Sequence, residues 1–252
     1  MPHSLSRADE ITRALRDDIL RGQYRAGERV PSERDLAARF GTSRSTVREA
    51  LKKLEQLGIA SIQPGGARVV PVQECTLDVL GPLLELNEIP DAKLMEQVLD
   101  IGTLLIGYAA ETAVERGDPA ALARVEAIID EILAADPGDL AQIRVPRRLG
   151  RAFAHASGNL VLLLIVNGLR TQLPDPRRVL GGPPRLDPKA LKRVAADLKA
   201  AVTQRDGTSA GSSMRELMAL MRAAARETLR SHRSHANETP FSHRSNAKET
   251  NS

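Results

Sequence analysis

The sequence predicts a mainly α-helical protein built from two globular parts. Apolar residues recur at spacings of three and four along most of the 252-residue chain, which is typical of helices that bury one face. A strand-like pattern is confined to one short segment, residues 59–70. After it, prolines and glycines interrupt a continuously helical pattern, so the second part is expected to be an all-α antiparallel bundle.

The first part is expected to begin with three helices. Apolar residues at four-residue spacing predict the first helix from Arg7 to Gly22. Ser32 can cap a second helix through a capping box with Asp35, and Ser43 can cap a third. The third helix would bury one aliphatic face, made of Val47, Ala50, Leu51, Leu54 and Leu57.

A hairpin is expected to follow the three helices. Ile59 and Ile62 fall in one strand, Val69 and Val70 fall in the next, and residues 64–66 supply a Pro-Gly-Gly turn. Three helices followed by a two-stranded wing form the winged helix-turn-helix arrangement. The sequence therefore predicts this fold for the first part.

Changes in composition, together with proline and glycine residues, divide the chain into four segments. The tail has almost no aliphatic residues, and its stretch SHRSHANET recurs as SHRSNAKET, so it is expected to be disordered. The predicted segments are a winged helix-turn-helix domain over residues 1–71, a linker over 72–76, an all-helical domain over 77–230, and a low-complexity tail over 231–252.

Composition also limits where the protein acts. No stretch approaches the 18 uninterrupted apolar residues of a membrane span, and the first residues lack the pattern of a signal peptide. The single cysteine, Cys75, excludes an intrachain disulfide and a cysteine-based zinc site. These features favour a cytoplasmic protein with no membrane partner.

The basic charge is concentrated at the start of the chain. Residues 1–70 contain thirteen Lys and Arg against nine Asp and Glu, so this quarter alone carries +4. An anionic partner and an ordinary solvated surface both fit that charge. The chain has no Trp, two Tyr and three Phe, which disfavours proteins that stack single-stranded bases on aromatic rings. Duplex DNA needs no such rings.

The start of the third helix has the composition of a DNA-reading element. In a helix-turn-helix the second helix of the motif enters the major groove, and its N-terminal residues meet base edges and phosphates. Arginine grips guanine in bidentate fashion, whereas hydroxyls and free N–H groups suit phosphate oxygens. We expect Arg44 to read a base and Arg48 to contact phosphate. The predicted contacts are Arg34, Ser43, Arg44, Ser45, Thr46 and Arg48.

The stretch PSERDLAARFGTSRSTVREALKKLEQLGI, residues 31–59, closely resembles the N-terminal domain of the GntR family of bacterial transcription regulators. The resemblance extends over about residues 8–71. It implies a dimeric DNA-binding repressor or activator that is controlled by a small ligand. It also implies DNA contacts at Arg34, Ser43, Arg44, Thr46 and Arg48, and entry of the wing tip at Gly65 into the minor groove.

The second part resembles the ligand-binding domain of the FadR subfamily, most clearly at FAHASGNLVLLLIVNGL, residues 153–169. This resemblance implies a helical effector and dimerisation domain. The expected effector is a small molecule of the organic-acid or acyl-CoA type. The candidate effector-binding residues are Tyr108, His155 and Asn159, of which Asn159 is also expected to cap or tie the break between two helices.

Most of that subfamily holds a divalent metal with one aspartate and three histidines inside the bundle. The positions expected to correspond to the aspartate and the first histidine are Pro146 and Gly150, and the other two histidines would fall near Ala195 and Leu217. His155 is the single histidine between residues 71 and 230, so three imidazoles are not available. The sequence therefore predicts no metal site of this type and no cofactor.

Three alternatives stay open beside a ligand-responsive, homodimeric repressor of a metabolic operon. An enzyme is disfavoured because the sequence offers no paired acid and base, metal site or nucleotide-binding loop. An architectural DNA-binding protein would not need a helical domain of this length. A regulator whose helical domain only dimerises, without sensing a ligand, fits the loss of the metal ligands.

Overall fold

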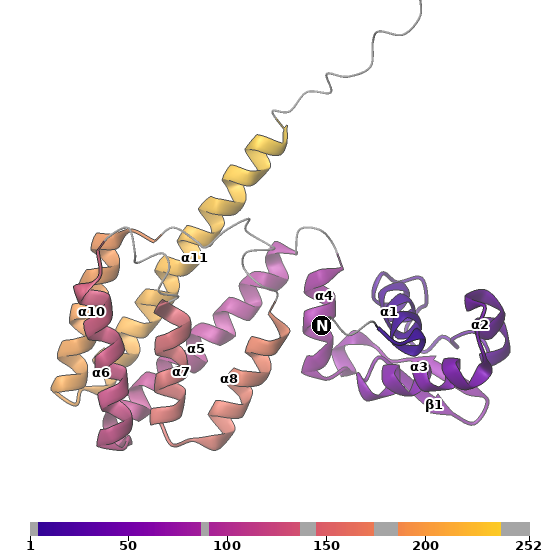
Figure 1. Ribbon diagram of the computed structural model, residues 1–252, viewed down its shortest axis with the longest axis horizontal. Helices are drawn as coiled ribbons and strands as arrows, with labels where there is room; N and C mark the ends of the chain where they lie inside the picture. The colour runs from indigo at the N-terminus through magenta and orange to yellow at the C-terminus, as the bar shows by residue number, and fades with distance from the viewer. Residues whose placement is uncertain (1–4, 87–90, 137–144, 174–185, 238–252) are drawn as a thin grey trace, which may run out of the picture. The chain divides into compact units, whose positions relative to one another are not determined.

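The computed structural model describes residues 5–86, 91–136, 145–173 and 186–237, and most of these residues are helical (Figure 1). The described residues group into two compact units. The first unit comprises those before residue 103 together with residues 163–173, and the second comprises the rest. A mainly helical protein with one small antiparallel sheet, as the sequence predicts, is confirmed.

The first unit begins with three short helices around one apolar core. They are α1 (Arg7–Leu20), α2 (Glu33–Phe40) and α3 (Arg44–Gln56). Each begins at a serine whose hydroxyl accepts a backbone N–H three residues later, so the caps predicted for α2 and α3 are confirmed. α1 ends two residues before the predicted Gly22. The core that the helices share includes Ile11, Leu15, Ile19, Leu36, Val47, Leu51 and Leu54.

Asp9 joins the first helix to the third. Lys53 Nζ on α3 donates a hydrogen bond to the Asp9 carboxylate at 2.7 Å, and the Ser6 backbone N–H donates another at 3.1 Å. These bonds, with that from the Ser6 hydroxyl, favour the ionised carboxylate and lower the pKa of Asp9 to about 2.

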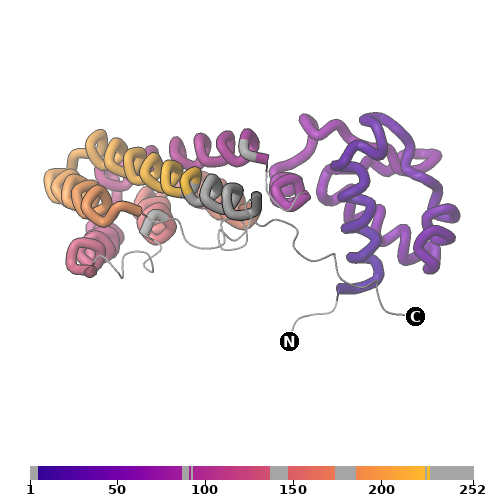
Figure 2. The backbone as a smooth tube through the Cα atoms, turned by 90° about the horizontal axis from the view of Figure 1, so that it is seen from above, coloured from indigo at the N-terminus to yellow at the C-terminus, as the bar shows by residue number. Residues whose placement is uncertain are grey.

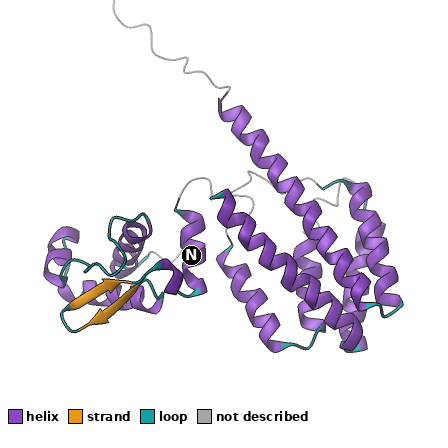
Figure 3. Cartoon of the chain, turned by 180° about the vertical axis from the view of Figure 1, so that it is seen from behind, coloured by secondary structure: helices purple, strands orange, loops and turns teal. Residues whose placement is uncertain are grey.

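The wing is an antiparallel hairpin of β1 (Ala60–Gln63) and β2 (Gly66–Val69), visible in Figure 3. Its strands are shorter than predicted, because Ile59 and Val70 lie just outside them and Gly66 is the first residue of β2. The other edge of β2 is also paired, since residues 27–30 exchange backbone hydrogen bonds with Ala67 and Val69 at 2.8–2.9 Å. The loop before α2 therefore belongs to the wing.

The segment after the wing packs on the same core. It contains two short 3-10 helices, Val72–Glu74 and Leu77–Val79, and α4 (Leu80–Glu85). Val79 is buried in the core of the first unit, and Leu83 packs against it. The linker expected over residues 72–76 thus has local helical structure, and the division of the chain at that point remains a prediction.

Long helices make up the remaining described residues. They are α5 (Ala92–Arg116), α6 (Pro119–Ala134), α7 (Val145–Ala156), α8 (Leu160–Gln172), α10 (Pro188–Thr203) and α11 (Gly207–Asn237). In the second unit α6 packs against α7 and α10, while α10 lies beside α11 (Figure 2). The largest fully buried side chain is that of Phe153 on α7. The predicted helical bundle is confirmed.

The two ends of α11 each show a structural feature. At Gly207, an added Cβ would lie 2.7 Å from the backbone oxygen of Glu111, so glycine permits the close approach of α11 to α5. At its other end, α11 continues to Asn237, although the tail was expected to begin at residue 231. Extending an existing helix costs no new nucleation, which explains why a polar sequence can remain helical there. The rest of the tail lies outside the described residues.

Candidate nucleic-acid interface

The N-terminus of α3 presents hydroxyls and unpaired backbone N–H groups outward. The Ser43 hydroxyl accepts the Thr46 N–H at 3.2 Å and lies within hydrogen-bonding distance of the Ser45 and Thr46 hydroxyls, at 2.7 and 2.9 Å. Ser43 and Ser45 are exposed and Thr46 is half-buried. The first turn of a helix has free N–H donors and a positive end of the helix dipole, so this surface suits an anion such as phosphate.

Arg44 is the first residue of this helix and is exposed. Within the described residues its guanidinium forms no ion pair or hydrogen bond. Arg34 on α2 is 76% exposed at its side chain, and its contact with Asp35 is a loose one of 3.5 Å. Both guanidinium groups can therefore reach another molecule without breaking a strong bond within the protein.

Arg48 is held differently. Its Nε and Nη2 donate to the two oxygens of Glu33 on α2, at 2.9 and 2.8 Å, in a bidentate ion pair. This pairing lowers the pKa of Glu33 and raises that of Arg48. The pair fixes the direction of the Arg48 side chain and joins the two helices of the motif. Sequence reasoning missed Glu33, because its partner lies fifteen residues away on another helix.

The wing turn contains Pro64 and Gly65, and Gly65 has φ +102°, a conformation that strongly favours glycine. A Cβ at this position would meet nothing within 4 Å, so the tip is open. An arginine lies close to this turn. A Cβ built at Gly66 would stand 2.9 Å from the Nε of Arg29. Arg29 was not among the predicted contacts.

The three candidate effector residues lie on different elements, and the described contacts do not bring them together. Tyr108 on α5 is 51% exposed, and His155 on α7 is exposed. Asn159 has a defined structural role, since its side-chain oxygen accepts the Leu162 N–H at 3.0 Å and caps α8. The cap predicted at this break is thus confirmed.

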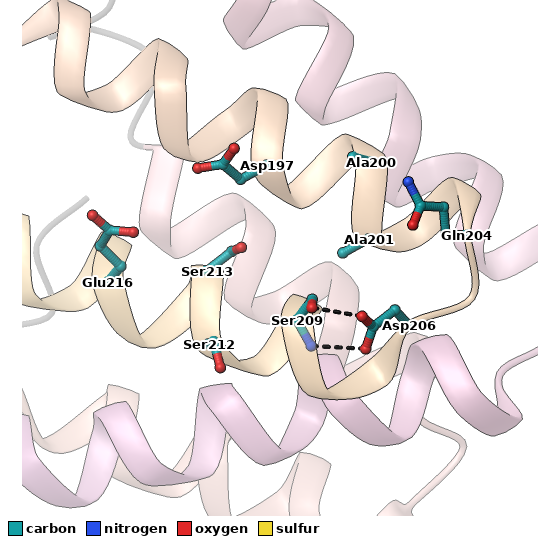
Figure 4. Close-up of a pocket in the computed structure, with 9 residues that line it drawn as sticks. All are labelled: Asp197, Ala200, Ala201, Gln204, Asp206, Ser209, Ser212, Ser213 and Glu216. Carbon is teal, nitrogen blue, oxygen red and sulfur yellow. Dashed lines mark hydrogen bonds between the residues drawn. The ribbon is translucent and has the colours of Figure 1, made fainter.

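A pocket of about 340 Å³ lies between α10 and α11 and is lined by none of the three candidates (Figure 4). It exposes three serine hydroxyls and the carboxylates of Asp197, Asp206 and Glu216. Asp206 accepts bonds from the Ser209 N–H and hydroxyl at 3.0 and 2.6 Å, and the other two carboxylates pair with Arg193. Three carboxylates repel an anionic ligand, so this pocket does not suit an organic acid.

Comparison with known families identifies both parts of the chain. Residues 7–70 match the family described as bacterial regulatory proteins, gntR family, and residues 97–220 match the FCD domain. The chain belongs to the GntR family. The resemblance inferred from residues 31–59 is therefore confirmed, and both families comprise regulators rather than enzymes.

Individual relatives agree with this membership. The chain is 34% identical over 113 residues to the HTH-type transcriptional regulator Mce2R of Mycobacterium tuberculosis, covering 44% of this chain and 47% of that protein. It is 28% identical over 158 residues to the fatty acid metabolism regulator protein of Edwardsiella ictaluri, covering 62% and 64%. The chain thus spans about half to two-thirds of the length of the curated relatives it matches.

A solved structure shows the same fold. Its title names Lar, a protein that controls expression of the agr system of Listeria monocytogenes. The TM-score of the match is 0.52. The match is 16% identical and covers 89% of this chain and 98% of that one. Among the described residues of this GntR-family chain, no helix has the length and apolar character needed to cross a bilayer.

Three of the four positions expected to correspond to metal ligands of the FadR subfamily are buried. Gly150 is buried, and Ala195 and Leu217 are 3% and 1% exposed. An added Cβ at Gly150 would stand 3.0 Å from a methyl carbon of Ile106, so Ile106 occupies part of this space. In the described part of the chain, no three His, Cys, Asp or Glu side chains gather where they could hold a metal ion.

Proposed function

We propose that this GntR-family chain is a homodimeric transcription repressor that binds a pseudo-palindromic operator in double-stranded DNA in the bacterial cytoplasm. The observation that carries the proposal is the state of Arg44, which is exposed at the N-terminus of a capped α3 and forms no ion pair or hydrogen bond within the described residues. An arginine in this position can form a bidentate bond with guanine without losing an internal partner. Arg34, Ser43, Ser45, Thr46, Arg48 and Gly65 complete the proposed DNA contacts.

Dimerisation is supported by two exposed apolar stripes. On α8, Leu160, Val161, Leu164 and Ile165 are 44–66% exposed and lie along one side of the helix. On α5, Ile101, Leu104 and Tyr108 are 51–64% exposed at helical spacing. Contiguous apolar surface of this kind marks association sites, because its exposure to water is energetically unfavourable. A dimer also doubles the number of base pairs read, which a single recognition helix needs for useful specificity.

The effector is proposed to be a small organic acid or an acyl-CoA that binds within the FCD domain and controls a metabolic operon. This rests on the match to the FCD domain and on the relative named as a fatty acid metabolism regulator. The acidic pocket between α10 and α11 does not support an anionic ligand, so the effector would bind elsewhere in the domain. The second candidate function is a regulator whose helical domain dimerises and senses no ligand.

Selection of duplexes from a random DNA library by the full chain tests the proposal. We expect enrichment of an inverted repeat, with a dimer in sedimentation experiments at micromolar concentration. Leu164→Glu should dissociate the dimer, whereas Arg170→Glu, exposed on the same helix outside the stripe, should not. The absence of any enriched sequence at low salt, or a monomer both with and without DNA, would refute the proposal.

The two candidate functions are separated by thermal shift measurements. Organic acids and acyl-CoAs are added in turn to the full chain, and a ligand that raises Tm in a concentration-dependent way supports the sensor. The same ligand should change operator affinity in parallel. If no compound shifts Tm while the dimer binds its operator, the function reduces to a ligand-independent regulator.

A further inference from the structure

The edge of the wing brings two arginines face to face. Residues 27–30 run antiparallel to β2 on the side opposite β1, and Arg29 is the residue bridged to Arg68. Paired residues of antiparallel strands point to the same face. The neighbours Ala67 and Val69 are 4% and 6% exposed, so the core lies on the other face. Both arginines consequently lie on the exposed face of the wing.

The two arginines place like charges on one face of the wing. Like charges placed directly opposite each other across two strands destabilise a sheet. In the part of the chain that the structure describes, neither arginine forms an ion pair with a carboxylate. The Arg68 Nη1 donates to the Gly27 carbonyl oxygen at 2.9 Å, which orients its guanidinium without neutralising it. Both positive charges therefore face solvent, but their guanidinium groups lie at different points along the wing, that of Arg68 beside Gly27 and that of Arg29 beside Gly66.

Gly66 keeps one of these charges beside the wing turn. An added Cβ at Gly66 would lie 2.9 Å from Arg29 Nε and 3.1 Å from its Nη2, so a side chain there would displace the guanidinium. The φ of Gly66, +125°, also favours glycine. The guanidinium of Arg29 thus rests against the strand next to Gly65, the residue expected to enter the minor groove.

We propose that Arg29 and Arg68 are two phosphate contacts on the exposed face of the wing, which hold the DNA backbone beside the groove entered at Gly65. The inference rests on the proposed function as a duplex-DNA-binding regulator. A guanidinium group binds phosphate through two parallel hydrogen bonds, so each arginine can hold a phosphate of the backbone by itself. Such contacts supply affinity without reading sequence.

The test measures binding of the full chain to two fluorescent duplexes at several salt concentrations. One duplex is recovered by selection with the wild-type chain, and the other is its scrambled version. Arg29→Ala and Arg68→Ala should each weaken binding to both duplexes by the same factor and reduce the salt slope by about one. Arg29→Lys keeps the charge and should keep the slope. Arg124→Ala removes an equal charge from an exposed site on α6 and should change neither.

Stability supplies a second readout. Arg29→Glu reverses one of two like charges on the same face of the wing and breaks no ion pair within the described residues, so Tm should not fall while DNA affinity does. A fall in Tm for Arg29→Glu would show that Arg29 acts through the fold, and it would overturn the assignment of Arg29 as a phosphate contact. Arginine variants that bind like Arg124→Ala, or that lose affinity for the selected duplex alone, would overturn the phosphate assignment. A wild-type chain that binds neither duplex would instead refute the proposed function.

Discussion

Arg44→Ala should remove base recognition while leaving the fold intact. Arg44 follows the cap residue of α3 and is exposed without an internal ion pair in the described residues, so its loss should not change Tm. A bidentate arginine–guanine pair contributes about 1–3 kcal/mol of discrimination. At about 1.4 kcal/mol per tenfold change, operator affinity should fall by about 5- to 140-fold, with a much smaller loss on scrambled DNA.

Arg48→Ala is the matched comparison, because the structure gives this arginine a partner. Its removal leaves the Glu33 carboxylate without its bidentate partner close to the proposed DNA backbone, where it would repel phosphates. We expect all sequences to be bound more weakly by a common factor, with a salt slope reduced by about one. Adding Glu33→Gln to Arg48→Ala should restore part of the lost affinity, since the unpaired charge is then gone.

Binding isotherms on operator and scrambled duplexes at several salt concentrations measure these effects, and melting curves confirm that the variants fold. Equal losses on both duplexes for Arg44→Ala would show that Arg44 does not read a base. No gain from adding Glu33→Gln would show that the carboxylate does not oppose DNA binding. Normal binding by both arginine variants would place the interface away from α3.

The remaining predictions concern the fold and are measured by thermal or denaturant unfolding of the full chain. Asn159→Ala removes the cap of α8 and should cost about 1 kcal/mol, whereas Asn159→Ser should retain most of it. Gly207→Ala places a Cβ 2.7 Å from the Glu111 oxygen and should cost about 1–3 kcal/mol, whereas Gly168→Ala on α8 meets nothing within 4 Å and should not destabilise. Because the pKa of Asp9 is lowered in the folded state, its ionised carboxylate stabilises the fold above about pH 4, and this contribution is lost as pH falls towards 2. Asp9→Asn should therefore reduce the decrease of Tm between about pH 4 and pH 2. The same pH dependence of Tm in the wild-type chain and in Asp9→Asn would contradict this prediction.

The first unit was predictable because its signals are local. The cap at Ser43 lies beside the helix that it starts, and the apolar spacing that follows defines the buried face of α3. Boundaries were less accurate, with α1 ending at Leu20 and β2 beginning at Gly66. The end of a helix depends on its last hydrogen bonds, and several neighbouring residues can satisfy them equally well.

The partners of the predicted site residues were not predictable from local patterns. Glu33 and Arg48 meet because of the angle at which α2 and α3 cross. The spacing of residues within either helix does not specify that angle. Arg29 and Arg68 meet because a loop pairs with the outer edge of β2 in one register. A shift of one residue would turn one arginine to the opposite face. Such pairs depend on tertiary arrangement, which a motif match does not contain.

The helical domain shows a different limit, because apolar spacing cannot say what covers an apolar face. Leu162 and Leu164 are identical side chains on the same helix, yet the first is 4% exposed and the second 60%. When a helix is apolar on two sides, one side packs against its own domain, and the other side must be covered by another molecule or remain exposed to water. In the proposed dimer a second copy of the chain covers the α8 stripe. Tyr108, 51% exposed on α5, then belongs to the association surface rather than to an effector pocket.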